Sequence, residues 1–259
     1  MVRGLYTAYT GMINQQKKLD TITNNLANAS TTGYKREGLT AKSFNENFTI
    51  KVNDLTEGVI TRNIGRMSLG VKIGENYTDY KQGPLKNTEG TFDVALDGRG
   101  FFAISFTNKQ GVTTTKYTRD GEFTIDVDGY LRTKDGDYVL NEGGGQIVVP
   151  TNAVDVVIDR QGNIFADGEY ADTIQITDFE DYNYLKKYGE NMYDTVDGAV
   201  PAESEASVIQ GYLEMSNINV VSEMVEMITI TRAYEAAQKA IQNADTMTEK
   251  AVNQVGRVQ

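Results

Sequence analysis

The sequence predicts an α+β fold, in which the N- and C-terminal helices pair as a coiled coil and an antiparallel all-β domain of hairpins is inserted between them in the sequence. Three observations predict it. Apolar residues recur at helical spacing near both ends, they alternate with a period of two in the middle, and Asp-Gly turns separate the alternating runs. The predicted domains are residues 1–34 (N-terminal helix), 35–80 (extended connector with short strands), 81–210 (β domain with a return path) and 211–259 (C-terminal helix).

The N-terminal helix is predicted from a heptad repeat, in which apolar residues recur every seven positions at Leu5, Met12, Leu19 and Leu26, with Ile22 among the positions three places on. A helix of this length would extend about 36 Å and end near Asn28, before a turn in which Gly33 can adopt the left-handed conformation. Its polar positions carry amides rather than charges, including Asn24, Asn25 and Asn28. Such amides either bridge neighbouring helices or form an exposed polar face.

Residues 35–80 show no sustained period and are punctuated by glycines. We expect one or two short strands here, because a structureless loop of this length is uncommon inside a compact domain.

The middle of the chain, residues 92–179, is predicted to form hairpins. Short apolar runs are separated by Asp-Gly pairs that begin at Asp97, Asp120, Asp128, Asp135 and Asp167. The polar segment 182–206 is interpreted as a return path, and residues 211–214 as one last strand.

The C-terminal helix is predicted over residues 220–255, after Asn219 as N-cap. Its seam alternates steps of three and four through Met227, Ile230, Tyr234, Ala237, Ile241, Ala244, Thr248, Ala251 and Val255. A second apolar stripe, made of Val221, Val225 and Ile228, would stay in water in a two-helix hairpin, so we expect further copies of the chain to cover it. The polar faces suggest ion pairs between subunits through Glu223, Glu226 and Arg232.

Composition excludes several classes of function. The formal charge of −11 and the pI near 4.6 argue against nucleic-acid binding, because no basic stripe is available to contact phosphates. Histidine and cysteine are absent, which removes the common catalytic triads and the usual zinc ligands. We therefore expect no enzymatic activity, no catalytic residues, no cofactor and no metal site. No apolar run is long enough for a membrane span, and the N-terminus lacks the apolar core of a cleavable secretory signal.

Two alternatives remain open at this stage. Residues 124–135, with Asp126, Asp128 and Asp135, distantly resemble a calcium loop, although their flanks alternate like strands. A carbohydrate- or calcium-binding β module on a coiled-coil oligomerisation stalk is the leading alternative. An enzyme that works through paired carboxylates is the other.

Three segments resemble the axial proteins of the bacterial flagellum. Residues 19–35 (LDTITNNLANASTTGYK) are similar to the N-terminal signature of rod and hook proteins. Residues 211–220 (GYLEMSNINV), with Met227-Ile228 and Arg232–Glu235, are similar to the C-terminal one. Residues 93–102 and 117–123 resemble the β-domain core of the larger rod proteins. Size and layout resemble the rod proteins of intermediate length, of the distal or the proximal type.

This resemblance implies a structural subunit that forms a helical homopolymer around an export channel, with the terminal helices in its inner tube. It implies a drive shaft that transmits torque from motor to hook. The implied partners are other rod and hook proteins and the flagellar type III export apparatus. The implied location is the basal body in the cell envelope and periplasmic space, reached without a cleavable signal peptide. The expected assembly interface comprises Leu5, Met12, Leu19, Ile22, Asn24, Asn25, Leu26, Asn28, Gly33, Tyr34, Met227, Ile230, Tyr234, Ala237, Ile241, Ala244, Ala251 and Val255.

Overall fold

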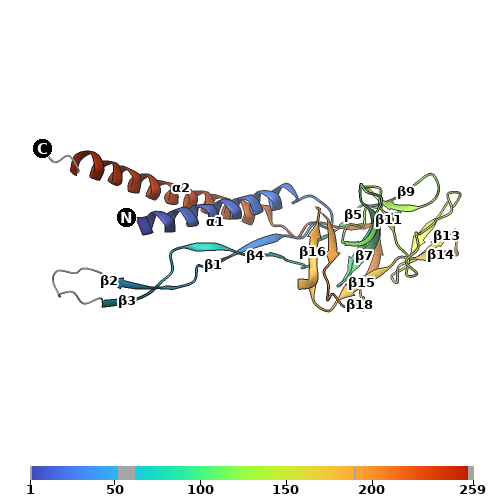
Figure 1. Cartoon of the computed structure of the whole chain (residues 1–259). Helices are drawn as coiled ribbons and strands as arrows, with labels where there is room; N and C mark the ends of the chain where they lie inside the picture. Colours follow the sequence, from blue (N-terminus) through green and yellow to red (C-terminus); the bar gives the residue numbers. More distant parts are fainter. Residues whose placement is uncertain (1, 52–61, 190, 256–259) are drawn as a thin grey trace. The chain divides into compact units, whose positions relative to one another are not determined.

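The computed structural model describes residues 2–51, 62–189 and 191–255, and it confirms the α+β class, with a helix at each end and antiparallel sheets between them (Figure 1). The chain forms two compact units. Unit 1 comprises Met1–Ala27, Glu37–Asp79 and Asn219–Gln259, and unit 2 comprises Asn28–Arg36 and Tyr80–Ile218. Segments of the two units therefore alternate along the sequence.

The two long helices belong to unit 1. Helix α1 (Val2–Ala27) and helix α2 (Val220–Lys250) lie side by side and run antiparallel, and α2 continues into a short π-helical segment, η2 (Ala251–Val255). Asn219 caps α2 as the sequence predicts, because its side-chain oxygen accepts a hydrogen bond of 3.2 Å from the Ser222 N–H. Helix α1 ends one residue before Asn28, the predicted end.

The connector in unit 1 contains more strand than the one or two short strands expected from its sequence. Strand β1 (Glu37–Ser43) pairs antiparallel with β4 (Val71–Thr78), and β2 (Asn47–Lys51) pairs with β3 (Arg62–Met67). Residues 52–61 of the predicted connector lie outside the described residues. Both β1 and β4 pack against α1. Strand formation in this weakly patterned segment therefore depends on that packing as well as on its own sequence.

Unit 2 contains the remaining strands. The largest sheet has nine strands, in which the order β16-β17-β8-β7-β11-β10-β9 is joined at β7 by β15, which in turn pairs with β18. These strands are β7 (Phe101–Thr107), β8 (Thr113–Thr118), β9 (Phe123–Ile125), β10 (Leu131–Thr133), β11 (Tyr138–Val139), β15 (Ile176–Phe179), β16 (Leu185–Tyr188), β17 (Met192–Thr195) and β18 (Pro201–Glu203).

Smaller sheets complete the unit. Strands β12 (Val156–Ile158), β13 (Asn163–Ala166) and β14 (Glu169–Thr173) form one of them. Strand β6 (Val94–Asp97) pairs with β19 (Ser207–Gln210), and β5 (Leu85–Asn87) pairs with β20 (Tyr212–Glu214). The last two strands of unit 2 thus pair with its first two, so the chain enters and leaves the unit through paired strands.

The predicted hairpin turns are confirmed at Asp128, Asp135 and Asp167, where the following glycines have positive φ between paired strands. Asp120-Gly121 serves another purpose. A Cβ on Gly121 would lie 2.8 Å from the carbonyl carbon of Val94, so glycine is needed there for close packing of two backbone segments.

The core of unit 2 forms from the inward faces of these strands. One buried cluster comprises Val94, Leu96, Phe102, Phe123, Leu131, Val139, Ile147, Val149, Val156, Ile158, Ile164, Ala166, Ile174 and Val208. A second cluster, of Phe101, Phe179, Leu185 and Tyr193, packs against Tyr80, Tyr117 and Tyr182. The two neighbours Phe101 and Phe102 thus point into different clusters, as successive residues of a strand do.

The polar segment 182–206 is not a plain return path. It begins with a 3₁₀ turn, η1 (Tyr182–Tyr184), and contributes β16, β17 and β18 to the nine-stranded sheet. The prediction was wrong because few apolar residues mark these strands. Pairing of β17 with β8 and burial of Tyr193 and Leu185 hold them in place.

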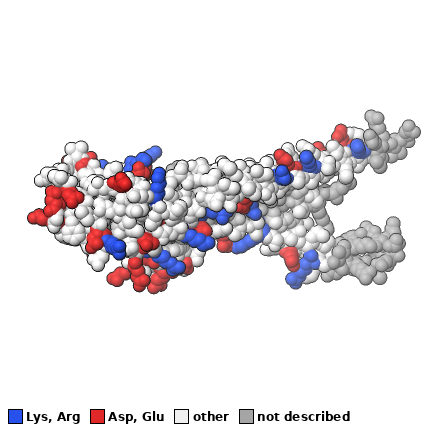
Figure 2. Space-filling model, turned by 180° about the vertical axis from the view of Figure 1, so that it is seen from behind, with Lys and Arg blue, Asp and Glu red and all other residues white. Residues whose placement is uncertain are grey.

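Charge is distributed unevenly between the two units. Acidic and basic residues balance in unit 1, so the whole excess of acidic residues lies in unit 2. On the face shown in Figure 2, red acidic side chains gather over the β-rich part, whereas both signs are mixed on the helices. Unit 1 can therefore approach copies of itself without net repulsion.

Candidate functional site

Helix α2 has an inner face that packs in unit 1 and an outer face that remains exposed. At roughly 100° per residue, the predicted seam lies on one side of the helix. Ile230 is buried, and the half-buried members are Met227, Tyr234, Ala237, Ile241, Ala244 and, in η2, Ala251. Thr248, which the seam also includes, is exposed. Val255 ends η2, and its side chain lies outside the described residues.

The second apolar stripe lies on the opposite side of α2. Val221, Val225 and Ile228 are 71%, 59% and 55% exposed, against 6% for Ile230. Met224, at 48%, widens this stripe. An exposed, continuous apolar surface of this kind is typical of a protein–protein contact.

Helix α1 buries a different set of residues from the heptad positions alone. Ile22 is buried, whereas Met12, Leu19 and Leu26 are half-buried and Leu5 is exposed. The asparagine side chains of α1 also differ in burial. Asn14 and Asn25 are buried, and Asn24 is exposed. The packed face of α1 thus includes polar residues, since both α2 and the β1–β4 ribbon cover the helix.

Asn25 joins three elements of unit 1. Its Nδ2 donates to the Glu37 carbonyl (2.8 Å) at the start of β1 and to Glu223 Oε2 (3.2 Å) in the first turn of α2. Its Oδ1 accepts from the Glu37 N–H (3.0 Å). Both partners of the Asn25–Glu223 bond are fully buried, so Glu223 is not placed for the ion pair between subunits that the sequence suggested. The amide instead sets the register of α1 against α2.

The other predicted interface residues lie in unit 2, in the segment that follows α1. Asn28 is half-buried, and Gly33 and Tyr34 are buried. Gly33 has φ of 66°, the left-handed conformation expected of it. A Cβ there would also lie 2.6 Å from the carbonyl carbon of Arg119. Tyr34 packs under Lys187, whose Nζ lies 3.7 Å from its ring centroid.

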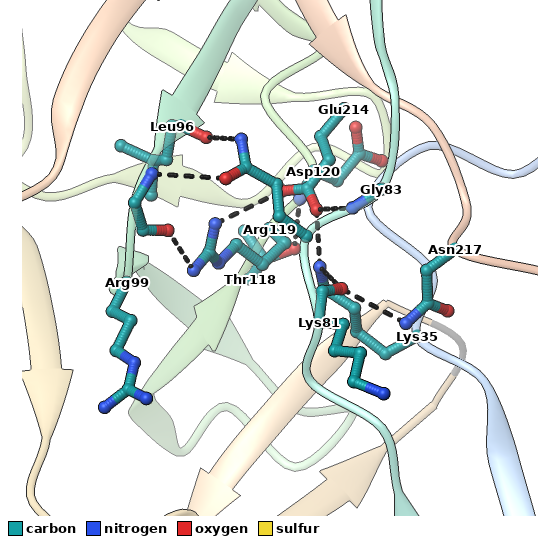
Figure 3. A network of polar contacts seen from close by, with 12 residues as sticks. Lys35, Lys81, Gly83, Leu96, Arg99, Thr118, Arg119, Asp120, Glu214 and Asn217 are labelled. Carbon is teal, nitrogen blue, oxygen red and sulfur yellow. Dashed lines mark hydrogen bonds and ion pairs between the residues drawn. The ribbon is translucent and has the colours of Figure 1, made fainter.

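A buried polar network fixes this segment in unit 2 (Figure 3). The Glu214 carboxylate, at the end of β20, forms an ion pair with Lys35 and accepts from Arg119 Nη1 (3.2 Å) and from the Gly83 N–H (2.8 Å). The side chains of Glu214, Lys35 and Arg119 are at most 4% exposed. Buried charges of this kind are stable only when they are paired and hydrogen-bonded.

The surrounding backbone completes the network. Lys35 Nζ also donates to the Lys81 carbonyl (2.8 Å), and Arg119 Nη2 donates to the Gly98 carbonyl (2.8 Å). The Gly33 N–H donates to the Glu214 carbonyl (2.8 Å), and the Arg36 N–H donates to Asn217 Oδ1 (2.8 Å). The segment after α1 thus runs beside the segment before α2, and Glu214 joins both to the sheet.

Asp120 lies beside this network and is half-buried. Burial raises the pKa of its carboxyl above the usual range, and hydrogen bonds from the Thr32 hydroxyl, the Glu122 N–H and Asn191 oppose that rise. Asn191 Nδ2 lies 3.1 Å from Asp120 Oδ2. Thr32 and Asp120 therefore form a second link between the segment after α1 and the turn after β8.

Sequence reasoning did not assign a role to Lys35, Arg119 or Glu214. Each belongs to a different one of the three segments that resemble axial proteins, and in the structure these segments meet at the Glu214 carboxylate. A single charged residue in each motif carries no local signal of burial.

Residues 124–135, which distantly resemble a calcium loop, contain the β9–β10 hairpin. Asp126 in this hairpin forms an ion pair of 2.7 Å with Arg132. Among the described residues, no three His, Cys, Asp or Glu side chains gather so as to hold a metal ion. Within the same part of the chain, no helix is long and apolar enough to cross a membrane.

Family profiles match three parts of the chain. The profile described as "Flagella basal body rod protein" matches residues 5–35, "Flagellar hook protein FlgE/F/G D1 domain" matches residues 95–166, and "Flagellar basal body rod FlgEFG protein C-terminal" matches residues 209–254. The first and third cover most of α1 and α2. The second covers a large part of the nine-stranded and three-stranded sheets.

Full-length relatives match as well. The chain is 31% identical to the flagellar basal-body rod protein FlgF of Caulobacter vibrioides, with 100% of each chain covered. It is 33% identical to FlgG of Bacillus subtilis, over 98% of this chain and 99% of the relative, and 35% identical to FlgG of Agrobacterium fabrum, over 95% and 97%. Identity at this level over whole chains, together with three profiles in matching order, shows that this chain belongs to the family of flagellar basal-body rod proteins.

Proposed function

We propose that the chain is a structural subunit of the bacterial flagellar basal-body rod. Copies assemble helically around an export channel, and the resulting shaft transmits torque from motor to hook. The full-length similarity to the flagellar basal-body rod proteins FlgF and FlgG supports the rod assignment. The proposal gives the chain no catalytic role.

The observation that carries the proposal is the exposed apolar stripe on α2. Val221, Val225 and Ile228 lie opposite the face of α2 that packs in unit 1, so no further packing of α1 can cover them. Burial of an aliphatic side chain is worth about 1.5–3 kcal/mol relative to exposure. Contact with neighbouring copies would recover that free energy at several positions per subunit.

We propose that α1 and α2 form a coiled coil in the inner tube of the assembly. The heptad spacing of the α2 seam, its orientation towards the packed side of unit 1 and the Asn25–Glu223 hydrogen bond support this arrangement. The balanced charge of unit 1 supports it further, because subunits in a tube bring many copies of the same surface together. The predicted interface residues Leu5, Met12 and Leu19 retain exposed area for such contacts.

The proposed partners follow from the same assignment. They are copies of the chain itself, other rod and hook proteins, and the flagellar type III export apparatus that delivers the subunit to the basal body in the cell envelope. Delivery in this way requires no cleavable signal peptide. The sequence contains no cysteine, so no disulfide opposes passage as an extended chain.

Replacement of Val225 and Ile228 with Asp tests the proposal. Each introduces a charge on the outer face of α2 only, so we expect a folded subunit that fails to assemble and a host bacterium that loses motility. Circular dichroism of the purified variant checks the fold, and electron microscopy of basal bodies checks the rod. Gln238→Asp, at an exposed polar position of the same helix, is the matched control and should swim normally. Normal rods in the double variant would contradict the proposal.

A further inference from the structure

Unit 1 contains an apolar groove beside the N-terminal end of α1. It has a volume of about 670 Å³ and is lined by Tyr6, Tyr9, Phe44 and Leu69, with Thr10, Asn45, Asn47 and Lys72 completing the lining. The four apolar side chains are all at least 36% exposed. A concave surface with this lining is suited to the apolar side chains of a helix.

The outer face of α2 carries an apolar patch of limited length. We call it the outer patch, and it consists of Val221, Met224, Val225 and Ile228, all exposed. Farther along the same face the helix becomes polar, through Arg232, Glu235 and Lys239. The patch thus spans about two turns, or roughly 11 Å, a length that a single groove can accommodate.

The groove and the outer patch lie at opposite ends of the antiparallel helix pair. The Asn25–Glu223 hydrogen bond of 3.2 Å places the outer patch beside the C-terminal end of α1. Tyr9 precedes Asn25 by more than four helical turns, a separation of roughly 24 Å along α1. The groove of a chain therefore cannot receive the outer patch of the same chain.

We infer that the outer patch of one copy packs into the groove of the next copy. This inference rests on the proposed self-assembly and names one of its contacts. A convex apolar patch and a concave apolar groove at opposite ends of one unit form a head-to-tail contact, in which each copy still offers its free patch or groove to a further copy. Lys72 borders the groove, and Glu235, which lies between Arg232 and Lys239 on the face beyond the patch, is the residue of opposite charge that can meet it.

Cysteine crosslinking tests this contact, because the chain has no cysteine of its own. The full-length single variants Leu69→Cys and Val225→Cys are purified, mixed and treated with a short bismaleimide. We expect a crosslinked dimer in the mixture. Neither variant treated alone should give this dimer. A chain that carries both substitutions should give a ladder of multimers, both in solution and in basal bodies of the host. The pair Leu69→Cys and Gln238→Cys is the matched control and should give no ladder.

The outcomes separate this contact from assembly in general. Crosslinking of Val225→Cys with itself would mean that two outer patches pack together, and it would overturn the inference. If electron microscopy shows rods but no crosslink forms, the contact between patch and groove is overturned and the proposed rod function stands. If neither rods nor crosslinks form, both the contact and the proposed rod function are overturned. Tyr9→Cys with Ile228→Cys provides a second pair, and circular dichroism confirms that each variant is folded.

Discussion

Glu214 is the residue on which the two connections of unit 2 converge. Its carboxylate is the shared partner of two buried cations, Lys35 and Arg119, and it also accepts a backbone N–H. Gly33 contributes at the same place through its conformation, since its φ of 66° and the nearby Arg119 backbone both exclude a side chain. These residues determine where the chain enters and leaves the β unit.

Replacement of Glu214 with Gln should destabilise unit 2 strongly. The substitution preserves size but leaves Lys35 and Arg119 buried without a counter-charge, at a cost of about 3–5 kcal/mol. Urea denaturation of the full chain measures the change in the free energy of unfolding. Glu122→Gln is the matched control, because its partner Lys134 is well exposed and solvent screens the attraction between them. Equal losses in the two variants would show that burial of Glu214 has no special importance.

At the scale of the elements, α2 presents two apolar faces, one of them buried and the other exposed. Its seam packs within unit 1 and its outer patch does not, although both are apolar in the sequence. Helix α1 differs, because its packed face includes Asn14 and Asn25 as well as Ile22. A helix covered by two kinds of neighbour buries a wider arc than a heptad seam.

Replacement of Ile230 with Asp should therefore act differently from Val225→Asp. A carboxylate at the buried position 230 would separate α2 from α1, while unit 2, with its own core, stays folded. Hydrogen exchange of the full chain should show lost amide protection in α1 and α2 and preserved protection in β7 and β8. Val225→Asp should retain protection in both helices. If Ile230→Asp left α1 as protected as before, the seam would not hold the helix pair together.

At the scale of the whole molecule, the two units are interleaved in sequence. Unit 2 includes residues 28–36, which the predicted boundary at residue 80 separates from it. The reason is the Glu214 network, which recruits Lys35, together with burial of Tyr34. A domain defined by strand periodicity alone omits this segment.

A fragment that starts at residue 80 should accordingly be less stable than one that starts at residue 28, when both end at residue 218. Without Lys35 and Tyr34, the shorter fragment loses an ion pair and buried aromatic area, and we expect its melting temperature to fall by about 10 °C. Calorimetry of the two fragments gives the difference. The longer fragment with Lys35→Met serves as an intermediate case. Identical melting temperatures for all three would show that residues 28–36 add no stability to the β domain.

Much of the fold was accessible from local pattern. The two long helices, Asn219 as N-cap, the Asp-Gly hairpins and the left-handed Gly33 all follow from short-range patterns, and the structure confirms each of them except two of the five turns. Strands β16, β17 and β18 were missed because long-range pairing, rather than their own composition, holds them. The assembly interface remains a prediction. Some of its residues are buried within the chain, whereas others keep exposed area.

The sequence alone determines that this chain has two long helices around a β domain and that α2 has more apolar surface than one partner can cover, because periodicity is a local property of the backbone. Tertiary structure determines which apolar face is buried inside the chain, which one stays exposed, and that three distant charged residues meet in one buried network. Those outcomes depend on contacts between residues far apart in sequence, and no local pattern encodes them.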